Sequence, residues 1–291
     1  MQTYAIRQKW EFVDAVKIKG YELEKARLQL QQALQLVAEV DSALGLREKD
    51  EGNYCEWLPE MRALAGVIVP GKQSFRVALS FPKFSLLITD SAGMVLRSFP
   101  LDGKTPLEGL AWLKSQINDL GSDAAKLAGE SLSVPAVHTT GEATFSFSDP
   151  STFEEVARLY ANAWHCLSFA VDKVGDTSPV RVASATMAMS VTTKVKDSSI
   201  VIGFKPQDAS CEEFYFYVKP SPAPNILPEK MGELEGGGRW TAEPWFGALM
   251  PASDWVFYNA EPMQADAVNM FLDSALDGLL EQLQSKPSVT T

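Results

Sequence analysis

The chain of 291 residues contains few of the side chains that most often carry catalysis or bind metal ions. It has two histidines and three cysteines, which are His138, His165, Cys55, Cys166 and Cys211. The cysteines are odd in number and far apart, and none forms a Cys-x-x-Cys pair, so they predict neither a disulfide framework nor a thiolate metal site. We therefore expect a reduced protein of the cytoplasm with no metal and no other cofactor.

Long apolar runs and an excess of basic residues are also missing. No stretch approaches the roughly 18 consecutive apolar residues of a membrane span. The first ten residues are polar and of mixed charge, unlike a signal peptide. With 37 acidic and 26 basic residues the formal net charge is −11, which opposes binding to phosphate backbones and to anionic membranes. We therefore expect neither nucleic acid nor a membrane among its partners.

What the sequence does have is clear helical periodicity near its start. Across residues 21–46, apolar side chains recur every three or four positions over about three heptads. This stripe, which we call the seam, consists of Leu23, Ala26, Leu30, Ala33, Val37, Val40 and Leu44. Its small residues would let a second helix approach closely, within the chain or across a dimer. The alternative is a helix packed on its own protein body.

A domain boundary is indicated after this helix. A short helix through residues 10–16 would form a helical hairpin, with Gly20 between the two helices, but residues 16–21 also alternate like a strand, and both alternatives stay open. Residues 47–53 are charged and end in Gly-Asn, which is typical of a solvated connector. We predict a helical arm over residues 1–65 and a body over residues 66–291.

The first half of the predicted body alternates strands with one helix. Period-two patterns predict a strand over residues 75–81 and a hairpin from residues 84–89 and 94–99. Thr105 and Glu108 have the spacing of a capping box, with proline at the first helical position between them, so a helix is predicted to follow.

The second half repeats this alternation. A short strand at residues 144–147 leads into a helix over residues 151–174, where Ser151 and Glu154 are spaced as a capping box. An antiparallel meander is predicted from the strands, which are residues 180–195, 199–204 and 213–219. A last amphipathic helix covers residues 266–283. The predicted fold is α+β: an N-terminal helical arm followed by a mainly antiparallel sheet body with three long amphipathic helices.

Two short motifs resemble catalytic signatures only in part. Residues 66–73 nearly spell a phosphate-binding loop, but Gln73 replaces the hydroxyl residue that would hold magnesium, and a strand rather than a helix follows. Ser80 and Lys83 have the Ser-x-x-Lys spacing of penicillin-recognising enzymes, but Pro82 falls inside the helical turn that this motif requires. We interpret both as chance matches.

The histidines also have simple explanations. His165 lies beside Cys166 on a predicted helix, where adjacent side chains diverge by about 100°, so the two do not form a dyad. We interpret His165 as a residue at the edge of the apolar stripe, and His138 as a polar residue of a surface loop. No third ligand accompanies them, which argues against a metal site.

The strongest ligand-binding candidate is an aromatic strand followed by a long loop. Tyr215 and Tyr217 lie on the opposite strand face from Phe214 and Phe216. Residues 220–247 contain five prolines and five glycines, too long for a simple connection. A loop over an aromatic sheet would make a pocket for a planar or anionic ligand, formed by Arg181, Tyr215, Tyr217, Arg239, Trp240 and Trp245. The alternative is a sheet buried on both faces.

Four short motifs punctuate the body. They are Ser-Asp-Pro at residues 148–150, Gly-x-x-Ser-Pro-Val at residues 175–180, the aromatic strand with Lys-Pro at residues 214–220, and Gly-Ala-Leu-Met-Pro at residues 247–251. In this order, over roughly residues 70–285, the chain resembles an uncharacterised bacterial family, domain of unknown function 5996. The resemblance implies an α+β architecture and supplies no reaction, because no activity is established for that family.

The chain departs from the family pattern after Ser-Pro-Val. At that point the family tends to continue with a histidine, aromatics and an Asp-bearing strand, whereas residues 181–186 here read Arg-Val-Ala-Ser-Ala-Thr. The resemblance therefore implies that the polar site those residues serve in the family is absent from this chain.

The seam and the scarcity of catalytic groups favour a non-enzymatic interaction or assembly protein. Its N-terminal helix would self-associate or dock a partner protein. One alternative is a small-molecule-binding protein or hydrolase with a pocket under residues 220–247. Another is a component of a larger assembly, such as a phage or secretion particle, in which the arm inserts between neighbours.

Overall fold

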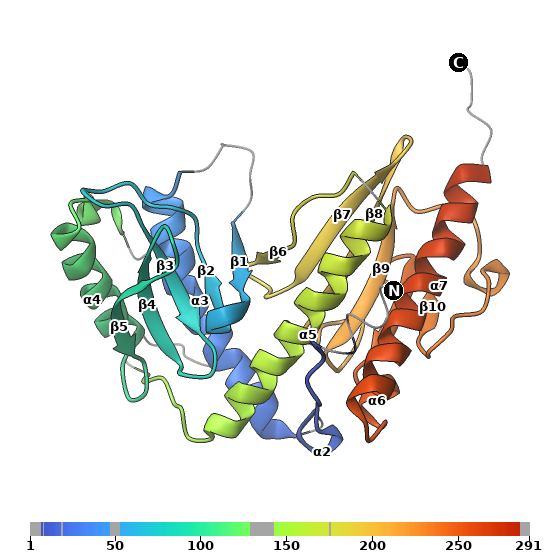
Figure 1. The fold of residues 1–291 in the computed structure, drawn as a ribbon, viewed down its shortest axis with the longest axis horizontal. Coiled ribbons are helices and arrows are strands. Elements are labelled where there is room, and N and C mark those ends of the chain that lie inside the picture. Colours follow the sequence, from blue (N-terminus) through green and yellow to red (C-terminus); the bar gives the residue numbers. More distant parts are fainter. Residues whose placement is uncertain are drawn as a thin grey trace. The chain divides into compact units, whose positions relative to one another are not determined.

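The computed structural model of the chain describes residues 7, 9–18, 20–46, 53–128, 143–174 and 176–285. It divides into two compact units. Unit 1 consists of Met1–Lys19, Arg158–Val180 and Ala188–Thr291, and unit 2 of Gly20–Ala157 and Arg181–Met187. Each unit combines helices with antiparallel strands, so the expected α+β class is confirmed (Figure 1). None of the helices described has both the length and the apolarity needed to cross a bilayer.

Unit 2 is a sheet covered by helices. Its helices are α3 (Tyr21–Leu44), η1 (Pro59–Met61), α4 (Pro106–Asp119), η2 (Ala124–Lys126) and the first turns of α5 (Pro150–Val174). Its strands are β1 (Tyr54–Leu58), β2 (Ala63–Ala65), β3 (Phe75–Ser80), β4 (Ser85–Asp90), β5 (Val95–Pro100) and β6 (Arg181–Ala183). They lie in the order β6-β1-β2-β3-β4-β5, with every neighbouring pair antiparallel.

The register of this sheet gathers large apolar side chains in one row. The row runs across five strands and contains Trp57, Leu64, Leu79, Leu86 and Phe99. Helices α3 and α4 cover it. The Phe99 ring stacks on Trp112 of α4 with centroids 5.1 Å apart, and a Cβ on Gly109 would lie 2.9 Å from Leu36 of α3.

Helix α3 lies in the interior of unit 2 and does not form an arm. Of the seam, Leu44 is half-buried and the other six residues are buried. The opposite side of the helix is also largely buried, and three of its glutamines bond to distant backbone. Gln29 accepts a hydrogen bond from the Ser146 amide, and the Gln31 and Gln35 amides donate to the carbonyls of Ala185 and Ser184. The unit boundaries therefore differ from the one expected at residue 65.

Unit 1 contains the second group of strands. Its helices are α2 (Ala15–Ile18), the remainder of α5, η3 (Pro228–Lys230), α6 (Ser253–Val256) and α7 (Glu261–Ser285). Its strands are β7 (Met189–Val195), β8 (Ser198–Lys205), β9 (Tyr215–Ser221), β10 (Arg239–Thr241) and β11 (Gly247–Pro251). The order is β10-β11-β9-β8-β7, again antiparallel throughout.

One face of this sheet, the inner face, packs against helices. Its central row consists of Met189, Phe204, Phe216 and Met250, all buried. Tyr160 of α5 meets Phe204 edge-on with ring centroids 5.7 Å apart, and Trp255 of α6 lies 6.3 Å from Phe216. Helices α5 and α7 lie on the same side of strands β7 to β9 (Figure 1).

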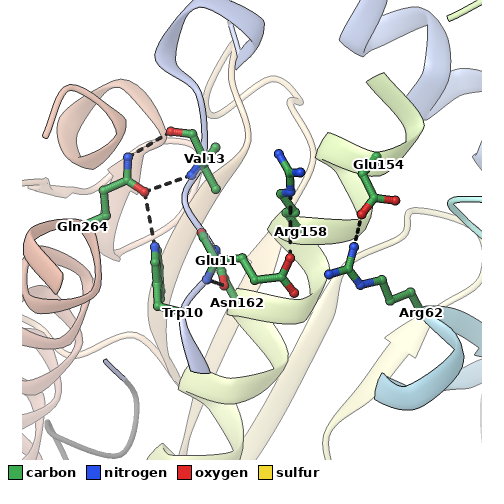
Figure 2. Close-up of polar contacts among 8 residues, drawn as sticks. All are labelled: Trp10, Glu11, Val13, Arg62, Glu154, Arg158, Asn162 and Gln264. Atoms are coloured by element: carbon green, nitrogen blue, oxygen red, sulfur yellow. Dashed lines mark hydrogen bonds and ion pairs between the residues drawn. The ribbon is translucent and has the colours of Figure 1, made fainter. Parts of the chain in front are cut away.

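The N-terminal segment of the chain is built into unit 1 by two buried amides (Figure 2). Gln264 of α7 is fully buried; its Oε1 accepts from Trp10 Nε1 and from the Val13 amide, and its Nε2 donates to the Val13 carbonyl. Asn162 of α5 pairs in the same two-way manner with the backbone of Glu11. Residues 10–14 form neither helix nor strand, and these amides bond to their backbone directly.

Glu11 and the start of α5 each form an ion pair. In unit 1, the Glu11 carboxylate lies 3.8 Å from Nε of Arg158. In unit 2, Arg62 pairs with Glu154 in the first turns of α5 (Figure 2).

Several local predictions are confirmed and others are corrected. Both hydrogen bonds of the capping box at Thr105 and Glu108 are present, and the hairpin of β4 and β5 forms. Helix α5 begins one residue earlier than expected, because Asp149 accepts from the Ser151 amide and takes the capping role predicted for Ser151. Residues 144–147 are not a strand, and the strand expected over residues 180–195 is broken into β6 and β7.

Replacing Gln264 with leucine should detach the N-terminal segment. The change strips Val13 and Trp10 of buried hydrogen-bond partners, so we expect a loss of about 2–4 kcal/mol in the free energy of unfolding and faster hydrogen exchange at the Val13 amide. Gln282→Leu, on the half-buried side of the same helix, is the matched control and should cost less than about 0.5 kcal/mol. Equal losses in the two variants would contradict this role.

Candidate functional site

The other face of the unit 1 sheet, which we call the outer face, is exposed at Lys194 and Arg239 and buried at Tyr215 and Leu249. Strand alternation places every second side chain here, and the register aligns Ser190, Gly203, Tyr217, Leu249 and Arg239 in one row. Lysines occupy further positions of this face on three strands, at Lys194, Lys205 and Lys219. The outer face therefore combines aromatic, hydroxyl and basic side chains.

Tyr215 anchors one end of this face. Its ring is fully buried and its hydroxyl donates to Asp208 Oδ1 at 2.9 Å. Lys205 pairs with the same carboxylate and holds its ammonium 5.3 Å from the Tyr215 ring centroid. Burial raises the pKa of Tyr215 well above its ordinary value. Burial alone would raise the pKa of Asp208, but hydrogen bonds from Lys205, the Ser210 amide and Tyr215 outweigh it and lower that pKa.

From Tyr215 an aromatic row continues across the face. The Tyr217 ring lies 6.1 Å from Tyr215 and 6.0 Å from Trp245, measured between centroids. It lies over Gly203, where a Cβ would come within 2.4 Å of the ring, so the neighbouring strand must have glycine at this position. The Lys219 ammonium stands 5.8 Å from the Trp245 ring. The row thus has a cation over the rings at each end.

The structure brings together only part of the site that the sequence predicts. Tyr215, Tyr217 and Trp245 form the aromatic row, and Arg239 lies two strands from Tyr217 on the same face. Trp240 points to the inner face, stacks with its ring centroid 6.4 Å from that of Phe246, and donates to the Gly232 carbonyl.

Arg181 belongs to unit 2. Its guanidinium lies 5.9 Å from the Tyr54 ring, because β6 pairs with β1.

The sequence reasoning missed four residues of the outer face. These are Lys205, Asp208, Ser210 and Lys219. Alternation within β9 puts Lys219 on the face of Tyr217, a signal already present in the sequence. The positions of the other three depend on pairing between strands and on the turn that follows β8. Neither can be predicted from the sequence pattern of a single strand.

A cavity of about 690 Å³ lies beside the glycine-rich part of residues 220–247. Its lining residues come from that segment, α6 and α7, and are Gly236, Gly237, Gly238, Ser253, Asp254, Phe257, Tyr258, Met263, Asp266, Ala267 and Met270. The structure thus has a cavity next to the predicted loop, but Tyr215, Tyr217, Arg239, Trp240 and Trp245 do not line it.

The imidazole and thiol on α5 are held in their neutral forms. Burial, with a smaller effect of Lys9, lowers the pKa of His165 to about 4, and its ring lies 5.2 Å from that of Trp164. Burial raises the pKa of Cys166. His138 lies outside the described residues. Within the ranges that the structure describes, no group of three or more histidine, cysteine or carboxylate side chains is arranged to hold a metal ion.

Comparison of the chain with protein-family models, with curated proteins and with solved structures finds no match.

Because the pKa of His165 is about 4 in the folded chain and ordinarily 6.5, the unfolded chain takes up the proton more readily between these values. The contribution of His165 to stability is therefore complete above pH 6.5 and falls away as the pH drops toward 4. Proton NMR should show an imidazole titrating at about 4 that disappears in His165→Gln and persists in His138→Gln. A His165 signal titrating near 6.5 would contradict burial of the ring.

Proposed function

We propose that this chain is a non-enzymatic interaction protein that docks an acidic segment of a partner protein on the outer face of unit 1. The supporting observation is the placement of charge. Lys194, Lys219 and Arg239 lie on this face, and none of them pairs with a carboxylate in the part of the chain that the structure describes. In a chain of net charge −11, unpaired cations on one face attract an acidic partner and orient its approach.

The aromatic row would supply the affinity that exposed charges alone do not. Tyr217 and Trp245 are half-buried and already fixed, Tyr217 by its packing over Gly203 and Trp245 by a hydrogen bond from Nε1 to Ser210 Oγ at 2.9 Å. Rigid tyrosine and tryptophan side chains lose little conformational entropy on binding and often dominate interfaces. Lysines around them would set orientation and the rate of association.

The sequence also suggests an interaction protein, but through the N-terminal helix α3 and not through the outer face of unit 1. Self-association or docking through α3 would need the seam exposed, whereas the seam is buried within the chain apart from half-buried Leu44. The outer face needs no rearrangement to meet a partner.

An acidic protein segment fits this face better than a nucleic acid. Basic groups must outnumber nearby acids along a polyphosphate for binding to survive physiological salt. Here Lys194, Lys219 and Arg239 cover a single sheet face, and the chain as a whole is strongly acidic. A short acidic segment can meet the face without bringing further negative charge along the rest of the surface.

Reversing two charges should abolish the interaction. Lys219→Glu with Arg239→Glu should weaken binding of a fluorescent oligoglutamate peptide at least about tenfold in low salt, measured by anisotropy. Lys114→Glu with Lys230→Glu makes the same change in net charge on residues outside this face and should leave binding within about twofold. Equal losses in both pairs would refute a specific surface. Tighter binding of an oligouridine RNA, lost in the same outer-face variant, would refute the choice of a protein partner.

The cavity beside Gly236–Gly238 favours small-molecule binding as a second function. Its volume of about 690 Å³ falls within the range of about 300–1,000 Å³ that is usual for ligand pockets. Its walls expose somewhat more apolar than polar surface, and a pocket with an apolar lining and placed polar groups is usual for ligands. Neither a histidine nor a cysteine lines it, so we propose binding rather than hydrolysis.

A further inference from the structure

We infer that the cavity lined by Gly236–Gly238, α6 and α7 takes a small organic cation, an amine carried on an apolar body. The inference rests on the second function proposed above and adds the chemical class of the ligand. It depends on three features of the lining: one carboxylate without a cationic partner, apolar side chains left exposed around it, and a wall made of backbone alone.

The carboxylate of Asp254 is the only charge in the lining that the described chain leaves uncompensated. Its Oδ2 accepts a hydrogen bond from the Gly238 amide at 3.0 Å, and no lysine or arginine of the described residues pairs with it. The second carboxylate, that of Asp266, accepts two hydrogen bonds from the Arg7 guanidinium, from Nε to Oδ1 at 2.6 Å and from Nη2 to Oδ2 at 2.5 Å. The cavity therefore carries about one net negative charge, located at Asp254.

Large apolar side chains surround this charge and remain in contact with solvent. Phe257, Met263 and Met270 are 58%, 51% and 45% exposed. The Phe257 ring lies 4.0 Å from that of Tyr258, so two aromatic faces meet at the rim. Grouped exposure of this kind marks a binding surface, and methionine side chains adapt to ligands of varied shape.

The three glycines let the chain pass close to α7 and leave the cavity without side chains on that wall. All three have positive φ, of +77°, +120° and +83°. A Cβ on Gly236 would lie 2.1 Å from the Ala267 carbonyl oxygen, and one on Gly238 would lie 2.8 Å from the Phe271 ring. Larger residues are therefore excluded here, and the space in front of Asp254 stays open.

Together these features select for positive charge. An ammonium group gains a charge-assisted hydrogen bond to Asp254 and an attraction to the aromatic faces, while its apolar body covers the methionines. A neutral analogue makes only the apolar contacts. An anionic analogue meets Asp254 as a like charge, so it binds least.

The test uses three probes of equal shape: phenylbutylamine, phenylbutanol and phenylbutyrate. Calorimetry on the full chain should give affinity in that order, with the amine at least about tenfold tighter than the alcohol. The methyl NMR signals of Met263 and Met270 should shift on binding, which places the ligand in the cavity. Asp254→Asn keeps an acceptor for the Gly238 amide and should bring the amine down to the affinity of the alcohol, with no change for the alcohol.

Asp119→Asn, at an exposed position of α4 in unit 2, is the matched control and should leave all three affinities unchanged. If the alcohol binds the wild-type chain as tightly as the amine while the methionine signals shift, the cavity binds small molecules but the choice of a cation is wrong. If none of the probes shifts those signals, both the cation and the small-molecule function are wrong. Melting temperatures of the variants separate either result from unfolding.

Discussion

The burial of helix α3 on nearly all sides is the constraint on which unit 2 depends. A polar side chain on a buried helix loses its hydrogen bonds to water unless the protein supplies a partner. Three glutamines of α3 bond to backbone at Ser146, Ala185 and Ser184, and Asp41 accepts from the Val67 amide, whereas the buried Oε1 of Gln32 has no partner among the described residues. One helix thus holds in place segments that lie more than a hundred residues apart in the chain. Unit 1 uses the same device with Gln264 and Asn162, which bond the N-terminal segment.

The sequence predicted those elements whose signals are local. The capping box at Thr105 and the hairpin of β4 and β5 depend on neighbouring residues only, and both are confirmed. The role of α3 was not predictable in the same way. Its period identifies an apolar seam but not what covers it, and the glutamines on its other side are typical of a solvated face. The hydrogen bonds of these amides to distant backbone become visible only in the folded structure.

The candidate site also contains some features that the local sequence predicts and others that depend on strand pairing. Alternation alone places Tyr215 and Tyr217 on one face, opposite Phe216. A single strand over residues 180–195 would place Arg181 on that face. The strand is broken between β6 and β7, and β6, which carries Arg181, pairs with β1. Trp240 follows Arg239 directly, so in a strand the two must point to opposite faces, and the structure places them so. Contacts between side chains of neighbouring strands, such as that of Lys205 with the Tyr215 ring, can be predicted only when the register of the strands is known.

The glycine-rich segment connects the two proposed binding surfaces, the cavity and the outer face, and the charges of the two surfaces stay separate. Gly236–Gly238 face the cavity as bare backbone, and the next residue, Arg239, already belongs to the outer face. Strand pairing of β10 with β11 fixes this change of direction, and the Gly238 amide is held by Asp254. One carboxylate therefore both positions the backbone and gives the cavity its negative charge. The cations on the strands of unit 1 that have no carboxylate partner among the described residues, Lys194, Lys219 and Arg239, are turned to the outer face instead. The basic side chains point to the outer face, and the Asp254 carboxylate points to the cavity. A ligand that suits one of these surfaces is therefore electrostatically unsuited to the other.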